Sequence, residues 1–284
     1  MIKQLFVVAA IIAIACAQCT RVPVSVTNAD ELFDALNNAK PGMDILLAPG
    51  KYLSQEKMPL LTKKGGDKDC PITISCDTYG AAFVYGTFQI MNCSYVTVRN
   101  LAISHWTRVL LSNNILLENL YICDADASGA EISYSSQITM RNCTFDNTDL
   151  GLDINHSEDV VAEGCTFASI ISQAVEIENS NRNTITDCAF NGSGYLFGGD
   201  SWMTIQYDSD YNMVSNNYFC NPDKQKMASG VNCLSGTNNV FKNNFMVINE
   251  DVYGFHFNDT KQKVCISNKV IGGMFTDGTV DKSC

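Results

Sequence analysis

The sequence predicts an all-β chain folded as a right-handed parallel β-helix, with a short helix capping its N-terminal end. An eight-residue block recurs along the chain at spacings of 19 to 29 residues. Within each block, apolar and polar residues alternate with the period of a β-strand. Repeats of this length, joined by Asn, Gly and Ser turns, are typical of β-helix coils. The blocks begin at Val96, Ile115, Ile138, Val160, Asn183, Asn212, Asn238 and Lys263.

The eighth position of the block supports this prediction, because it is apolar in every repeat. We expect these side chains to stack in one buried column, since each coil buries its inward residues only against its neighbours. Residues 70–271 should then form eight or nine coils. The column comprises Ile103, Ile122, Phe145, Phe167, Phe190, Phe219, Phe245 and Val270.

The sixth position of the block changes character along the chain. It is Cys143, Cys165 and Cys188 in three successive repeats. These cysteines form either a buried thiol ladder or disulfides between adjacent coils, and the sequence leaves both open. In the last three repeats the position is Asn217, Asn243 and Asn268. We expect these amides to point inward and bond the next coil.

The ends of the chain divide it into three parts. Residues 1–17 resemble a secretory signal peptide, with Lys3, a short apolar run and an Ala15-Cys16-Ala17 cleavage site. Residues 18–69 should form the N-terminal cap and the first coil, with an amphipathic helix over residues 27–36. Residues 70–284 should form the coils and a short C-terminal cap.

Composition predicts a secreted, extracellular glycoprotein. Twelve cysteines remain after the signal segment, and an even number in a secreted chain favours disulfides. No later apolar run reaches the ~20 residues of a transmembrane span. The net charge of −11 argues against a nucleic-acid partner. Five glycosylation sequons occur, at Asn92, Asn142, Asn155, Asn191 and Asn258.

Charged residues recur at one position of four successive coils, seven residues before the block. They are Arg108, Glu131, Asp153 and Glu176, and their apolar neighbours indicate that they point outward. Ser133, Asn155 and Glu178 follow two residues further on. We call Glu131, Asp153, Glu176 and Glu178 the acidic ladder. Strands ~4.8 Å apart would bring these carboxylates close enough to repel unless a cation neutralises them.

The N-terminal region resembles the pectate-lyase-like superfamily of right-handed β-helices. The similarity is greatest to polysaccharide lyase family six, the chondroitinase B and alginate lyase type. The residues concerned are Ala29–Leu36 (ADELFDAL), Lys40–Tyr52 (KPGMDILLAPGKY), Cys70–Ile74 (CPITI) and Tyr95–Leu101 (YVTVRNL). Catalytic motifs of the galacturonase-type hydrolases and family-one pectate lyases are missing as sets.

This resemblance implies a calcium site. Family-six members have an E-x-E pair and an Asn about one coil earlier as calcium ligands, with a Lys after the pair and an Arg one coil later for proton transfer. Glu176-x-Glu178 matches the pair, and Asn155 could match the Asn. With Asp153, these residues are the candidate calcium ligands. Arg182 is the counterpart of the Lys, whereas residues 183–223 contain no Lys or Arg.

Other candidates lie around the ladder. His156 is a second candidate for proton transfer, because it adjoins the acidic ladder. Trp202, together with Arg108 and Glu131, is predicted to contact substrate, and Trp106 could also stack on a sugar. Each feature also has a structural interpretation: a solvated acidic face neutralised by an Arg108–Glu131 pair, a surface histidine, and tryptophans packed at coil edges.

Two functional hypotheses follow. The first is an enzyme acting on acidic polysaccharide, most simply a calcium-dependent β-elimination lyase. The second is a non-catalytic extracellular glycan-binding or structural β-helix. The E-x-E ladder favours the enzyme, and the missing later Arg favours the second hypothesis. Whether the protein is catalytic therefore depends on the geometry of the ladder.

Overall fold

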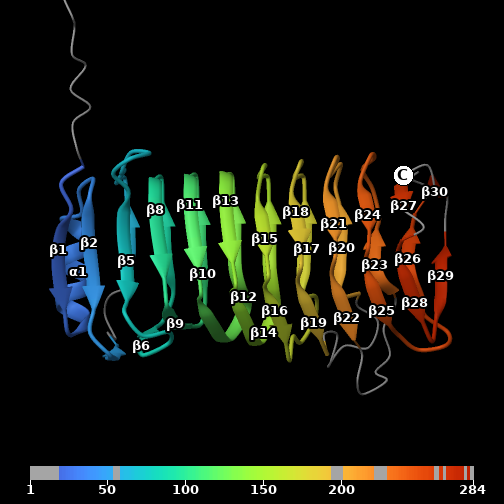
Figure 1. Cartoon of the computed structure of the whole chain (residues 1–284), viewed down its shortest axis with the longest axis horizontal. Helices are drawn as coiled ribbons and strands as arrows, with labels where there is room; N and C mark the ends of the chain where they lie inside the picture. Colours follow the sequence, from blue (N-terminus) through green and yellow to red (C-terminus); the bar gives the residue numbers. More distant parts are fainter. Residues whose placement is uncertain are drawn as a thin grey trace, which may run out of the picture.

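The chain is wound into a long stack of coils. The computed structural model describes residues 19–53, 58–192, 201–220, 229–258, 262–264, 267–277 and 280–281. The sequence runs steadily from one end of the stack to the other, and successive coils lie side by side (Figure 1). The predicted signal segment, residues 1–17, lies outside the described residues. No helix in the described ranges is both long enough and apolar enough to cross a membrane.

One sheet contains the first strand of every predicted block. Its strands pair in parallel, one coil after the next. Nine of them, β5 to β27, fall within residues 70–271, as predicted. In order they are β1 (Val22–Val26), β2 (Met43–Leu47), β5 (Ile72–Cys76), β8 (Ser94–Arg99), β11 (Asn113–Glu118), β13 (Ser136–Arg141), β15 (Val161–Glu163), β18 (Thr184–Thr186), β21 (Met213–Ser215), β24 (Val240–Lys242), β27 (Gln262–Val264) and β30 (Val280–Asp281).

A second sheet of 18 strands completes the coils. The long strands β12 (Tyr121–Ser133) and β14 (Thr144–Asn155) run through both of its rows. One row contains β4 (Leu60–Thr62), β7 (Phe88–Met91), β10 (Thr107–Leu110), β17 (Val175–Glu178), β20 (Met203–Gln206), β23 (Ser229–Cys233), β26 (Tyr253–Phe257) and β29 (Met274–Asp277). The other contains β3 (Gly50–Tyr52), β6 (Ala82–Tyr85), β9 (Leu101–Ser104), β16 (Thr166–Ala168), β19 (Ala189–Asn191), β22 (Tyr218–Cys220), β25 (Phe245–Val247) and β28 (Lys269–Ile271).

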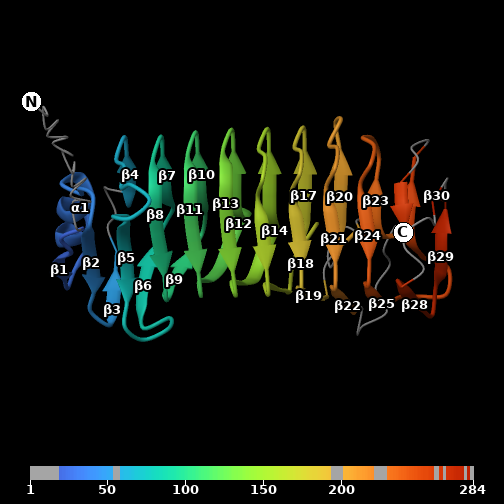
Figure 2. The same ribbon diagram turned by 45° about the horizontal axis from the view of Figure 1, so that its top comes forward.

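The N-terminal end of the stack is covered by the predicted helix, α1 (Ala29–Asn37), which lies beside β1 and β2 (Figure 2). Asn28 is its N-cap and accepts a hydrogen bond from the Glu31 backbone N–H, while Glu31 accepts one from the Thr27 N–H. This reciprocal pattern satisfies the Glu31 N–H in the first turn and the Thr27 N–H just before the helix. Leu32 and Leu36 point into the core. The helix therefore closes a sheet end that would otherwise be an exposed edge.

A sharp turn follows each strand from β8 to β24 of the 12-stranded sheet. Every residue at this turn has a positive φ, a conformation that Asn, Asp and Gly tolerate best. Gly164 occupies the turn where a Cβ would lie 2.6 Å from the Asn142 side-chain oxygen. The turn residues are Asn100, Asn119, Asn142, Gly164, Asp187, Asn216 and Asn243.

Four of the five predicted core phenylalanines form one buried stack. Neighbouring rings of Phe145, Phe167, Phe190 and Phe219 lie 4.3–4.9 Å apart and are nearly parallel. The prediction for Phe245 is wrong, because Met246 pairs with Phe219 and points inward instead. The pairing Val214–Phe241 shows the same shift of one residue in this coil. A shift of one residue moves every side chain to the other face of the sheet.

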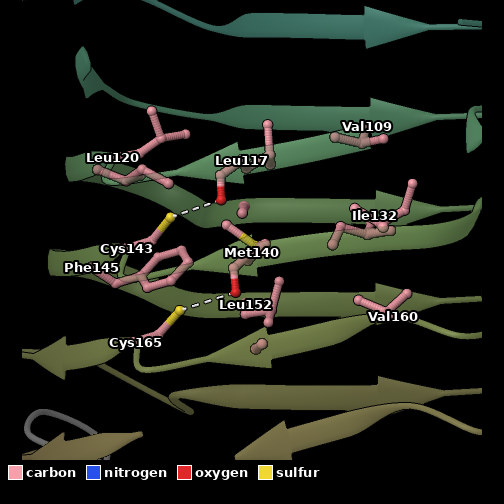
Figure 3. Packing of buried hydrophobic residues seen from close by; sticks show 14 of the residues in the cluster. Val109, Leu117, Leu120, Ile132, Met140, Cys143, Phe145, Leu152, Val160 and Cys165 are labelled. Atoms are coloured by element: carbon pink, nitrogen blue, oxygen red, sulfur yellow. Dashed lines mark hydrogen bonds between the residues drawn. The ribbon is translucent and has the colours of Figure 1, made fainter. Parts of the chain in front are cut away.

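The cysteine column is a thiol ladder within the described residues. Cys143, Cys165 and Cys188 are buried and reduced. The thiols of Cys143 and Cys165 donate to the carbonyl oxygens of Leu117 and Met140 (Figure 3). The described disulfide joins Cys19 to Cys70 near the N-terminal end.

The asparagine ladder exists, with one correction. The backbone N–H of Asn217 donates to the Asn244 side chain, and that of Asn244 donates to Asn268. Asn243, the residue predicted for this position, is the exposed turn residue instead. At the C-terminal end, β29 and β30 extend the two sheets. The predicted C-terminal cap stays a prediction, since residues 282–284 lie outside the described ranges.

Replacing Phe167 by Ala should lower the free energy of unfolding by about 3–5 kcal/mol, because it leaves a cavity between two stacked rings. The matched control is Phe245→Ala, which should cost much less because Phe245 is half-exposed. Chemical denaturation of both variants measures the difference. Equal losses would contradict the assignment of the stack.

Candidate functional site

The structure brings the predicted charged residues together on one outer face of the 18-stranded sheet. Arg108, Glu131, Asp153 and Glu176 pair in register on β10, β12, β14 and β17. Glu178 lies on the same face, because buried Ile177 separates it from Glu176. The acidic ladder therefore spans three neighbouring strands, as the repeat predicted.

One end of the ladder is neutralised by Arg108. Its Nη2 lies 3.2 Å from the Glu131 Oε1, and the Ser133 hydroxyl donates to the same oxygen at 2.6 Å. The Arg108 guanidinium also lies 4.9 Å from the centre of the Trp106 ring. The predicted pair of Arg108 and Glu131 is thus present. Trp106 contributes a cation–π contact that orients the arginine.

Two amides hold the carboxylates at the other end. The Gln206 Nε2 donates to the Glu176 Oε1 at 2.7 Å and to the Glu178 Oε1 at 2.6 Å. The Asn155 Nδ2 donates to the Glu178 Oε2 at 2.9 Å. Sequence reasoning missed Gln206, although it pairs in register with Glu178. The 29-residue spacing of this repeat concealed the match.

Asp153 lies between these two ends, and no described arginine or amide side chain is bonded to it. Its Oδ1 is buried and accepts no hydrogen bond from the described residues. Burial, together with the smaller contributions of the Glu176, Glu131 and Glu178 charges, raises the pKa of this carboxyl to about 7. Asp153 is therefore the ladder position that most needs a proton or a cation.

The donor set fits a hard cation, but it does not form a ready-made site. Carboxylate and amide oxygens at Asp153, Asn155, Glu176 and Glu178 are suitable calcium ligands, and the Asp153 Oδ1 lacks a partner. Within the described residues, however, no three Asp, Glu, His or Cys side chains converge closely enough to hold a metal ion. Binding would require the side chains held by Gln206 and Asn155 to turn.

Exposed side chains border the ladder where its strands end. His156 follows Asn155, its Nδ1 contacts the Asn155 Oδ1, and its ring stacks on Tyr134 at 4.8 Å. Tyr207 occupies the equivalent position two coils further on and is exposed. Sequence reasoning missed both tyrosines, although each directly follows the outward residue at the strand end. Together they offer ring faces on which a sugar could stack.

Two predicted site residues are corrected by the structure. Arg182 forms ion pairs with Glu158 and Asp159, and these carboxylates raise its pKa further above the ordinary arginine value. Arg182 therefore stays protonated and is unsuited to accept a proton. Trp202 has no exposed surface and packs against Phe219. The prediction that Trp202 stacks on substrate is therefore wrong.

The five sequons differ in their surroundings. Asn92, Asn142, Asn191 and Asn258 are exposed. Asn155 is half-buried, and its side-chain nitrogen donates to Glu178. A glycan on that nitrogen would lie over the acidic ladder. Glycosylation at all five sites stays a prediction.

Comparisons with known proteins identify the fold as a right-handed β-helix. The model of the family described as "right handed beta helix region" matches residues 64–195. An alginate lyase from Paenibacillus sp. str. FPU-7 has a similar structure, with a TM-score of 0.82 and 20% identity over 91% of this chain and 99% of that one. No curated protein matches the sequence.

Two further lyases share the fold at lower similarity. Pectate lyase Pel9A has a TM-score of 0.63 and 14% identity over 93% of this chain and 78% of that one. A mannuronic acid-specific polysaccharide family 6 lyase from the human gut microbiota has a TM-score of 0.53 and 13% identity, over 87% of this chain and 63% of that one. This chain therefore folds as a right-handed parallel β-helix, as the sequence predicted.

Asp153 should make stability fall as pH rises when divalent cations are absent. Its native pKa of about 7 lies above the unfolded value of about 3.9, so the native state holds an extra proton between these values. The contribution of Asp153 to stability is thus fully present below about pH 4 and is lost as the pH rises through about 7. Asp153→Asn should flatten this slope in urea unfolding with EDTA. Parallel slopes for the two proteins would contradict the assignment.

Proposed function

We propose that this protein is an extracellular enzyme that cleaves acidic polysaccharide by β-elimination at the acidic ladder. The observation that supports this most is the Asp153 carboxyl between Glu131, Glu176 and Glu178, whose buried Oδ1 has no hydrogen-bond partner among the described residues. Carboxylates that repel one another on an accessible face can bind a cation, and the bound cation can then bind an anionic ligand. The described disulfide and the predicted signal segment are consistent with an extracellular location.

Calcium is the proposed cofactor. Asp153, Asn155, Glu176 and Glu178 would hold it, and when bound it would neutralise the uronate carboxylate and acidify the adjacent carbon–hydrogen bond. Arg108 and Glu131, at the end of the ladder, would contact the neighbouring sugar. The Tyr134 and His156 rings would hold a sugar face beside the strand ends.

His156 is the proposed proton-transfer residue. It is exposed, it adjoins Asn155, and a neutral imidazole nitrogen can accept a proton. The neutral imidazole would take the proton from the carbon next to the carboxylate as the neighbouring carbon–oxygen bond breaks. A carbon–carbon double bond then forms, and the imidazolium returns the proton to the leaving oxygen. Because Arg182 is held by two carboxylates, His156 is the remaining predicted base.

The alternative is a glycan-binding protein without catalysis, and one observation favours it. Glu176 and Glu178 are fixed by the Gln206 amide rather than by a lysine or arginine that could transfer a proton. Such a protein would bind acidic polysaccharide through calcium and leave it intact. The two functions differ in product formation.

Cleavage is tested by the absorbance of unsaturated products on pectate, alginate and chondroitin, with and without calcium. We expect calcium-dependent product from at least one polymer. His156→Ala should lower kcat by about 10²–10⁴-fold, the usual effect of losing a general base. His105→Ala, which changes another exposed histidine, is the control and should keep activity. Absence of product from all three polymers would exclude the lyase and leave the binding protein.

Calcium should raise the melting temperature of the wild type. Binding to the folded state alone contributes RT ln(1 + [L]/Kd), about 2.7 kcal/mol at a hundredfold excess over Kd. The double variant Glu176→Gln, Glu178→Gln should abolish this rise. The double variant Glu163→Gln, Glu250→Gln, which removes two carboxylates away from the ladder, should keep it. No calcium effect on the wild type would exclude both cation-dependent functions.

A further inference from the structure

The outer face of the 12-stranded sheet has a groove distinct from the acidic ladder. Two adjoining hollows, of about 340 and 420 Å³, share Pro71, Thr97 and Leu116 in their walls. They extend over β2, β5, β8, β11 and β13. We call this surface the sheet groove. The acidic ladder lies on β12, β14 and β17 of the other sheet, so the two surfaces can be occupied separately.

Cations gather in the sheet groove although the whole chain has a net charge of −11. Its walls include four cationic side chains and two carboxylates. The cations are Arg21, Lys68, Arg99 and Arg141, and the carboxylates are Asp44 and Glu118. The groove is therefore a locally positive surface on an acidic protein, which attracts anions.

The carboxylates of the groove are already engaged. Asp44 bonds Arg21 at 2.8 Å, and Glu118 lies 3.6 Å from Arg141, which also pairs with Glu163 at 3.1 Å. Arg99 lines the groove in register with Glu118, yet it forms no ion pair within the described part of the chain. Its guanidinium is exposed and free to bind a carboxylate in a bidentate manner.

The remaining walls suit a sugar polymer. Thr97 and Thr139 offer hydroxyls in two coils, while Leu116 and Tyr95 offer apolar surface. Coils ~4.8 Å apart repeat these features along the groove. A polymer with regularly spaced carboxylates and hydroxyls complements a surface of this kind better than a compact anion does, because it meets several coils at once.

We propose that the sheet groove is a second binding surface for acidic polysaccharide, with Arg99 and Lys68 as its main contacts. The identity of this ligand rests on the proposed function. Binding here needs no calcium, because the protein itself supplies the cations, whereas the acidic ladder repels a polyanion until a cation is bound. The groove would hold the polymer while another stretch of it reaches the ladder, which raises the effective concentration there.

The test is binding of sodium polygalacturonate in EDTA, which removes the calcium-dependent contribution of the ladder. Calorimetry should show binding by the wild type that weakens with added salt. The double variant Lys68→Ala, Arg99→Ala should lower the affinity about tenfold. The control Lys263→Ala, Lys269→Ala removes the same charge from exposed sites outside the groove and should stay within about twofold of wild type.

Three results would overturn the inference: no binding in EDTA, equal affinities of the two double variants, or equal binding of methyl-esterified polygalacturonate. Thermal melting of both double variants verifies that each is folded. The proposed function is tested separately, by measuring unsaturated product and the effect of calcium on the melting temperature. Groove-dependent binding without product would support this inference and reject the lyase.

Discussion

Parallel, in-register pairing between successive coils is the constraint on which the rest of the structure depends. Each coil places equivalent residues ~4.8 Å from their counterparts in the next coil. Any side chain repeated at one position therefore contacts its own kind along the stack. For phenylalanines, thiols and amides this is favourable, as in the Phe145–Phe219 stack and the Asn217–Asn268 ladder. For carboxylates the same rule is unfavourable.

The acidic ladder is thus the place where the fold and its residues conflict. Arg108 relieves Glu131, and the Gln206 and Asn155 amides relieve Glu176 and Glu178. No described side chain relieves Asp153 in this way, and burial together with the neighbouring charges raises its pKa. Local conflict of this kind within an otherwise consistent structure is expected at functional sites. This conflict is the physical reason for locating the proposed function at the ladder rather than elsewhere along the stack.

Charge is distributed unevenly between the two sheets. The row Arg99, Glu118, Arg141, Glu163 alternates in sign along one sheet, so its neighbours attract. The ladder on the other sheet concentrates one sign. A polyanion is therefore expected to bind the 12-stranded sheet, and a divalent cation is expected to bind the acidic ladder. This separation would let one polymer chain be held by arginines and lysines while its carboxylates meet calcium at the ladder.

The sequence by itself determined the fold, the stacked phenylalanines and the outward acidic ladder, because the repeat is nearly regular through the middle coils. Only the tertiary structure decided the register after residue 237, where unequal spacings let the chain shift by one residue to bury Phe241, Asn244 and Met246. It also decided where individual side chains point. Trp202 is buried, Arg182 pairs with Glu158, and Gln206 bridges two glutamates, since these contacts join residues from different coils.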